Sequence, residues 1–188
     1  QVQSAAGAAR AVDAGADMLV VQGNEAGGHT GQSNLMPLLV RVLRDHPDLP
    51  VLAAGGIASG RSLAAVLATG ADGAWMGTAF IATHECDEVS DGYKRTIIAA
   101  RSEQTRYTKV FDVLDEAAFG IPRWPDGIAG RAIANEFLEK WHGNEEALRR
   151  EVREILPRYQ AWLFYPSEAA DTPSSVDFVD TRGITKPQ

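Results

Sequence analysis

Three short apolar runs, each ending in glycine, are separated by helical segments in the first 80 residues. The apolar runs are 15–23, 49–56 and 70–80. The helical segments are 3–14, 36–46 and 59–70. Strands that alternate with helices form a parallel sheet covered by helices, so the sequence predicts an α/β fold, either doubly wound or a (β/α)₈ barrel. The tripeptide GAD occurs at two helix–strand boundaries, which favours the barrel.

The order of the runs also predicts how the strands pair. We expect residues 18–22, 50–54 and 73–77 to be adjacent parallel strands in sequence order, with the helices on one side, because right-handed crossovers require it. The edge at residues 18–22 is expected to be apolar and unpaired.

The regular alternation stops after residue 80. The pattern predicts helices over 88–101, 130–141 and 145–164, the last one kinked or restarted at Pro157. Residues 102–130, rich in proline and glycine, are expected to form a long structured loop. The tail from Pro166 is expected to be partly disordered. We therefore expect three parts: a partial barrel with the active-site loops, a helical extension and a polar tail, over 1–102, 103–165 and 166–188.

Composition excludes several classes of protein. The net charge is −7 without a basic stripe, which argues against nucleic acid as a partner. No apolar run reaches the roughly 20 residues of a membrane span. The single cysteine, Cys86, rules out an internal disulfide and is typical of a cytoplasmic protein. The chain starts at Gln1 and enters a helix at once, so we expect it to be the C-terminal part of a longer protein.

The glycine turns lie where α/β proteins bind ligands, at the carboxyl ends of the strands. Gly55 and Gly56 expose backbone N–H groups, and Gly77 and Thr78 add further N–H groups and a hydroxyl. Together these groups would form a phosphate cradle that needs no lysine. The alternative is that each glycine only permits a tight turn. A side chain on Gly56 is expected to occupy the phosphate space.

His29 stands alone among glycines after the first apolar run. There its ring can face a ligand with little steric cover, and imidazole suits a general base near neutral pH. Its neighbour Glu25 would either orient the ring or cap the next helix. No second histidine or cysteine lies at ligand spacing, so a metal site is disfavoured.

The segments QGNEAGGHTG, VLAAGGIASG and GADGAWMGTAF, with GIAGRAIANEFLEKW, resemble the nitronate monooxygenase family over residues 4 to 142. This resemblance implies an FMN-dependent (β/α)₈ barrel that uses O₂ to oxidise alkyl nitronates, small molecules, to carbonyl compounds and nitrite. It implies that His29 lies beside the flavin N5, where it acts as base on neutral nitroalkanes or interacts with the nitronate. It also implies FMN contacts at Gly23, Gly28, Gly56, Trp75, Met76, Gly77 and Thr78. The ring of His29 is then expected at the end of the first strand, a flavin's length from the cradle.

The chain departs from that family in length. Only three strands are visible, and they correspond to the last three of eight, so the N-terminal half of the barrel is missing and must be supplied by more chain or by a partner. The sequence is also compatible with a homo-oligomer. Two other functions stay open: a flavin-dependent enoyl reductase, which has the same EAGGH turn, and a module that binds FMN or phosphate without catalysis.

Overall fold

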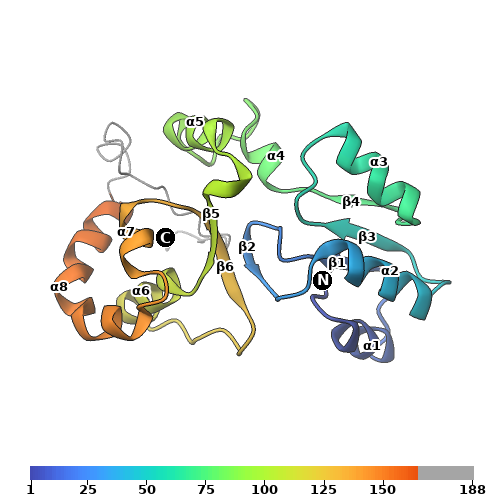
Figure 1. The fold of residues 1–188 in the computed structure, drawn as a ribbon, viewed down its shortest axis with the longest axis horizontal. Helices are drawn as coiled ribbons and strands as arrows, with labels where there is room; N and C mark the ends of the chain where they lie inside the picture. The colour runs from blue at the N-terminus through green and yellow to red at the C-terminus, as the bar shows by residue number, and fades with distance from the viewer. Residues whose placement is uncertain (165–188) are drawn as a thin grey trace, which may run out of the picture. The chain divides into compact units, whose positions relative to one another are not determined.

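The structure, a computed structural model, describes residues 1–164 (Figure 1). The contacts between residues divide the chain into two compact units. Unit 1 comprises Gln1–Val89 and Trp124–Arg131, and the described part of unit 2 comprises Ser90–Arg123 and residues 132–164. The segment Trp124–Arg131 therefore returns to unit 1 after an excursion through unit 2. The functional division into 1–102, 103–165 and 166–188 stays a prediction.

Unit 1 is built on a parallel sheet in the predicted order. Its strands are β1 (Leu19–Gln22), β3 (Val51–Ala54) and β4 (Gly73–Trp75). The strand order is β1-β3-β4, with Leu19 opposite Val51 and Leu52 opposite Gly73. The predicted pairing and its direction are confirmed. All three carboxyl ends, and the glycine turns that follow them, consequently lie at one edge of the sheet.

The helices of this unit are α1 (Ala5–Asp13), α2 (Leu35–Asp45), α3 (Gly60–Thr69) and the short α4 (Thr78–Ile81). The first and third begin at serine caps, as their sequences favour. The Oγ of Ser4 accepts the N–H of Gly7 at 3.0 Å, and Ser59 and Ser62 form a reciprocal capping box. Helix α3 ends at Gly70, whose φ of 110° suits glycine.

The helices and the sheet enclose one apolar core in unit 1. Fully buried side chains come from α2 and from the neighbouring strands β1 and β3, including Leu39, Val42, Val21 and Val51. The apolar period of α2 places Leu38, Leu39 and Val42 on this face, whereas Val40 is exposed. Burial of such side chains contributes about 1.5–3 kcal/mol each, so this core fixes the sheet edge that carries the turns.

The predicted open edge at residues 18–22 is partly wrong. Val2 forms an isolated parallel bridge with Val21. The N–H of Val2 donates to Val20 at 2.8 Å, and the N–H of Gln22 donates to Val2 at 2.9 Å. The sequence did not predict this bridge, because a single paired residue leaves no periodic pattern of apolar residues. The outer edge of β1 is therefore hydrogen-bonded where it leads into the first glycine turn.

A second pairing joins segments far apart in the sequence. Strand β2 (Gly28–Thr30) runs antiparallel to β6 (Ala129–Ile133), with His29 opposite Gly130. The predicted helix over 130–141 is wrong in its first part, where the chain forms β6. The helix α7 (Glu136–Trp141) begins only after its cap residue Asn135, whose side chain accepts the N–H of Leu138 at 2.6 Å. Such short strands depend on a distant partner, so local periodicity gives little sign of them.

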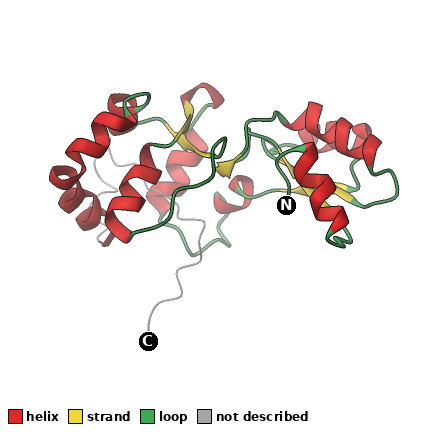
Figure 2. Cartoon of the chain, turned by 90° about the horizontal axis from the view of Figure 1, so that it is seen from below, coloured by secondary structure: helices red, strands yellow, loops and turns green. Residues whose placement is uncertain are grey.

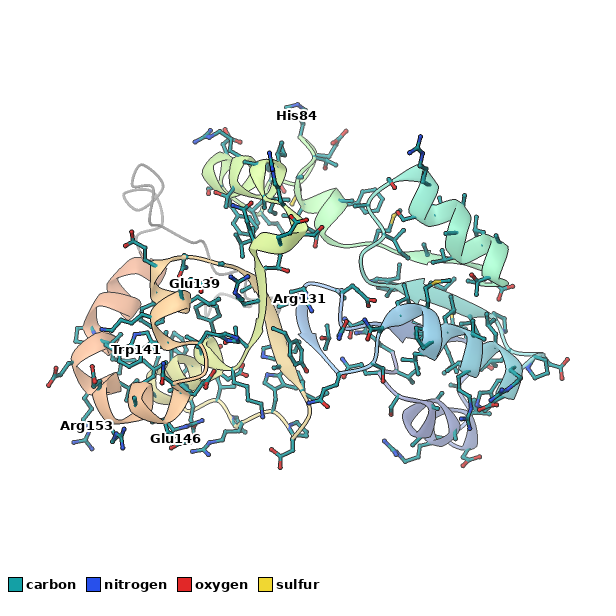
Figure 3. All side chains as sticks on the ribbon, in the orientation of Figure 1. His84, Arg131, Glu139, Trp141, Glu146 and Arg153 are labelled. Atoms are coloured by element: carbon teal, nitrogen blue, oxygen red, sulfur yellow. The ribbon has the colours of Figure 1, made fainter. Side chains whose placement is uncertain are left out.

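Unit 2 is mainly helical (Figure 2). Its other elements are α5 (Asp91–Ala99), η1 (Ser102–Gln104), β5 (Thr105–Thr108), α6 (Val110–Phe119) and α8 (Glu145–Phe164). The predicted loop over 102–130 is wrong for residues 102–119, which are mostly regular, and confirmed for residues 120–128. The apolar residues of α6 recur at helical spacing and pack against α8 and Trp141, which Figure 3 labels.

Helix α8 runs through Pro157 without ending there, so the predicted restart is wrong. The tail from residue 166, for which we expect disorder, lies outside the described residues. Within residues 1–164, every helix is too short or too polar to span a lipid bilayer.

Candidate functional site

The first two glycine turns of unit 1 contact each other at the carboxyl edge of the sheet. Gly55 and Gly56 have φ values of 116° and 66°, which side chains rarely adopt. A Cβ on Gly55 would lie 3.0 Å from the amide nitrogen of Ala26, and one on Gly56 would lie 3.2 Å from the Cβ of Glu25. The turn after β3 is thus packed directly against the turn after β1.

The first turn also reaches the third. A Cβ on Gly27 would lie 3.3 Å from the Oγ1 of Thr78, the first residue of α4. Because β3 lies between β1 and β4, the segment after β1 must extend past the end of β3 to make this contact. The structure therefore brings the three predicted turns together around the residues 25–27.

Backbone donors are available at these turns. In the part of the chain that the structure describes, the N–H groups of Gly56, Gly77 and Thr78 donate to no acceptor. A Cβ on Gly77 would meet no described atom within 4 Å. Gly77 therefore borders open space next to two N–H groups and the hydroxyl of Thr78. These are features that a phosphate cradle requires.

Gly56 has a structural reason to be glycine, and its expected contact with the phosphate stays a prediction. A side chain there would start towards Glu25 and would need a left-handed backbone, so glycine is required by the turn itself. Gly23 is constrained in a similar way, because its Cβ would lie 2.5 Å from the amide nitrogen of Leu35. Of Gly23, Gly55, Gly56 and Gly77, it is at Gly77 that an added Cβ would meet no described atom within 4 Å.

Glu25 caps α2. Its two carboxylate oxygens accept the N–H of Leu35 at 3.1 and 3.0 Å, and Asn34 at the cap position makes no side-chain cap bond. A carboxylate at this end also complements the helix dipole. Of the two roles that the sequence left open for Glu25, the structure therefore favours the cap.

His29 lies on β2, after the first turn, so the expected position at the end of the first strand is corrected. Its backbone carbonyl accepts a hydrogen bond from the Nε2 of Gln3 at 3.1 Å. The same Nε2 donates to the Oε1 of Gln22 at 2.6 Å. The imidazole of His29 stacks on the indole of Trp124, with ring centroids 4.4 Å apart and planes inclined by 20°. His29 is thus fixed through both its backbone and its ring.

Two residues of this site were missed by sequence reasoning. They are Trp124 and Arg131, which lie about a hundred positions from the turn they contact. The Nε of Arg131 donates to the carbonyl oxygen of Asn24 at 2.6 Å, and Figure 3 shows Arg131 on β6 beside β2. No local pattern marks them, because their contacts depend on the return of Trp124–Arg131 to unit 1.

The remaining predicted cofactor residues have varied surroundings. Trp75, at the end of β4, has 59% of its surface exposed, whereas Met76 packs against the core of unit 1. Gly28 opens β2 with a φ of 74°. Their contacts with FMN stay predictions. Among the described residues, no three His, Cys, Asp or Glu side chains gather as a metal site would require.

Comparisons with known proteins identify relatives of the chain. The profile of the nitronate monooxygenase family matches residues 1–154. The nitronate monooxygenase of Pseudomonas aeruginosa is 34% identical over 170 residues, covering 74% of this chain and 48% of that protein.

Two solved structures are also similar to the chain. A nitroalkane oxidase from Streptomyces ansochromogenes superposes with a TM-score of 0.66 and 32% identity, covering 92% of this chain and 48% of that one. FabK from Thermotoga maritima superposes with a TM-score of 0.64 and 31% identity, covering 90% and 47%. The chain spans between about a quarter and a half of the curated relatives it matches.

Proposed function

We propose, from the premise that this chain belongs to the nitronate monooxygenase family, that it is the C-terminal part of an FMN-dependent enzyme. The complete enzyme would use O₂ to oxidise alkyl nitronates to carbonyl compounds and nitrite. The observation that carries the proposal is the meeting of three glycine turns at the carboxyl edge of a parallel sheet, with His29 on the strand that follows the first turn.

The three parallel strands would be the last three βα units of a (β/α)₈ barrel, and residues 1–102 would carry the cofactor and active-site loops. Active sites of such barrels lie at the carboxyl ends of the strands, the edge at which the turns meet. Three strands cannot close a barrel, so the remaining strands must come from other residues.

The FMN phosphate would be held by the N–H groups of Gly56, Gly77 and Thr78, with Gly55 shaping the turn. Gly23, Gly28, Trp75 and Met76 would line the rest of the cofactor site. When bound, the flavin would supply the redox chemistry with O₂, and the protein supplies orientation and the base.

His29 would act on the neutral nitroalkane. An imidazole nitrogen takes the α-proton, the C–H bond breaks, and its electron pair moves onto the nitro group to give the nitronate. The anchored backbone and the stacked ring limit the motion of this imidazole, as a positioned base requires. A substrate supplied as the nitronate needs no such proton transfer.

The test uses the full-length protein that contains this chain. We expect a bound flavin absorbance band, and oxygen consumption when a short alkyl nitronate is added without a nicotinamide cofactor. The alternative, a flavin-dependent enoyl reductase, would instead oxidise NADH with an enoyl thioester. A protein that binds flavin but performs neither reaction would be the non-catalytic module, and one without flavin would contradict the proposal.

A further inference from the structure

The aromatic ring of Trp124 stacks on the ring of His29. The 4.4 Å between the ring centroids and the 20° between the planes describe an almost parallel arrangement, which is favourable for aromatic pairs. The indole is 40% exposed, so it covers the imidazole without being part of the apolar core. One face of the imidazole is thereby covered.

The backbone on both sides of this contact is fixed. After Trp124 the chain turns at Pro125–Ile128, where the N–H of Ile128 donates to the carbonyl of Pro125 at 3.1 Å and Gly127 has a φ of 84°. The chain then enters β6, which pairs with β2 and so with the backbone of His29. His29 therefore lies in the antiparallel ladder, and Trp124 lies on the turn segment that leads into its other strand.

A second contact ties the same segment to the glycine turn. Arg131 stands opposite Gly28 in the ladder, and its Nε–H donates to the carbonyl of Asn24. The segment Trp124–Arg131 therefore contacts the residues before His29 and the ring of His29 itself. The contacts of Arg131 with Asn24 and of Trp124 with His29 both restrict the movement of β2 relative to the first turn.

We propose that Trp124 is a positioning residue, which holds the His29 imidazole in one orientation so that its nitrogens, at the ring edge, face the substrate. The orienting role rests on the stacked geometry, and its catalytic consequence rests on the proposed function. A base displaced by about 1 Å loses much of its effect, up to about 100-fold in rate. Loss of the indole should therefore impair the proton transfer and spare steps that need no base.

The orientation is tested first, by NMR of the full-length protein labelled in its histidine rings. His29→Asn assigns the resonance. In the wild-type protein the ring protons of His29 should be shifted upfield by the indole, the shift should disappear in Trp124→Leu, and Trp124→Phe should retain part of it. Phe119→Leu, which removes another exposed aromatic ring, should change nothing. An unshifted wild-type resonance would overturn the proposal without any Trp124 variant having to fold.

The catalytic consequence is tested with the same variants. Trp124→Leu should keep its flavin and lower kcat/KM for a neutral nitroalkane about 10-fold or more, while kcat/KM for the matching nitronate stays within about 3-fold. Trp124→Phe should recover most of the loss. Equal losses on both substrates, or no loss despite an altered ring resonance, would overturn the positioning role. If the wild-type protein turns over neither substrate, the proposed function fails, and the ring shift alone still decides whether Trp124 holds His29.

Discussion

Both carboxylate oxygens of Glu25 accept the backbone N–H of Leu35, at 3.1 and 3.0 Å. The acceptor comes from the first glycine turn, and the donor is the first residue of α2. This pair replaces the local cap that Asn34 does not provide, and it holds the turn against the helix that follows. The route of the turn past Gly56 depends on the same side chain, because Glu25 contacts that position.

Replacing Glu25 by alanine should therefore act on stability. The loss of the cap should lower the free energy of unfolding by about 1 kcal/mol, within the range of about 0.5–2 kcal/mol for helix caps. Glu25→Gln retains an acceptor and should lose less. Urea denaturation of the three proteins measures the difference. A Glu25→Ala variant of unchanged stability that loses turnover of neutral nitroalkanes would instead restore a role in orienting His29.

The sheet and its glycine turns could be predicted because their determinants are local. The strands are short apolar runs, α3 is capped by Ser59 and Gly70, and the order of the units fixes parallel pairing. Strands β2 and β6 could not be predicted, because three paired residues leave no periodic pattern of apolar residues in the sequence. For the same reason Trp124 and Arg131 were missed, since only the pairing of β6 with β2 brings them to the turn.

At Gly77 we expect a substitution to separate cofactor binding from folding. Its φ of −112° and ψ of −70° are accessible to other residues, and a Cβ there meets no described atom within 4 Å. Gly77→Val should thus fold normally but fill the space proposed for the phosphate, so the purified protein should carry little flavin. The flavin-to-protein absorbance ratio measures this. Ala64→Val, on the exposed side of α3, serves as the matched control and should keep its flavin. Stoichiometric flavin in Gly77→Val would rule out the cradle at this position.

Unit 2 should lose stability in acid through Glu116. Hydrogen bonds from Arg123 and Arg149 hold the pKa of this carboxyl below its ordinary value of 4.5. A group whose pKa is lowered in the folded state stabilises the fold above its unfolded pKa, and this stabilisation is lost as the pH falls through the folded pKa. Glu116→Gln should therefore be less stable than the wild type near neutral pH.

Urea denaturation between about pH 7 and about pH 2 checks this dependence. The difference between wild type and Glu116→Gln should persist down to about pH 4.5 and shrink below it. Because the carboxyl is one-third exposed, solvent screening keeps the effect modest. Glu151→Gln, on an exposed position of α8, is the control. A constant difference across the whole range would mean that the ionised form of Glu116 contributes nothing.

The central claim, that His29 is the base of a nitronate-forming flavoenzyme, is tested most directly by His29→Asn in the full-length protein. Its kcat/KM is measured by oxygen consumption on a neutral nitroalkane and on the corresponding preformed nitronate, with bound flavin measured in parallel. We expect the flavin to stay bound, turnover of the nitroalkane to fall by about 10²- to 10⁴-fold, and turnover of the nitronate to fall much less. Equal losses on both substrates, or no loss on either, would contradict the assignment of His29 as the base.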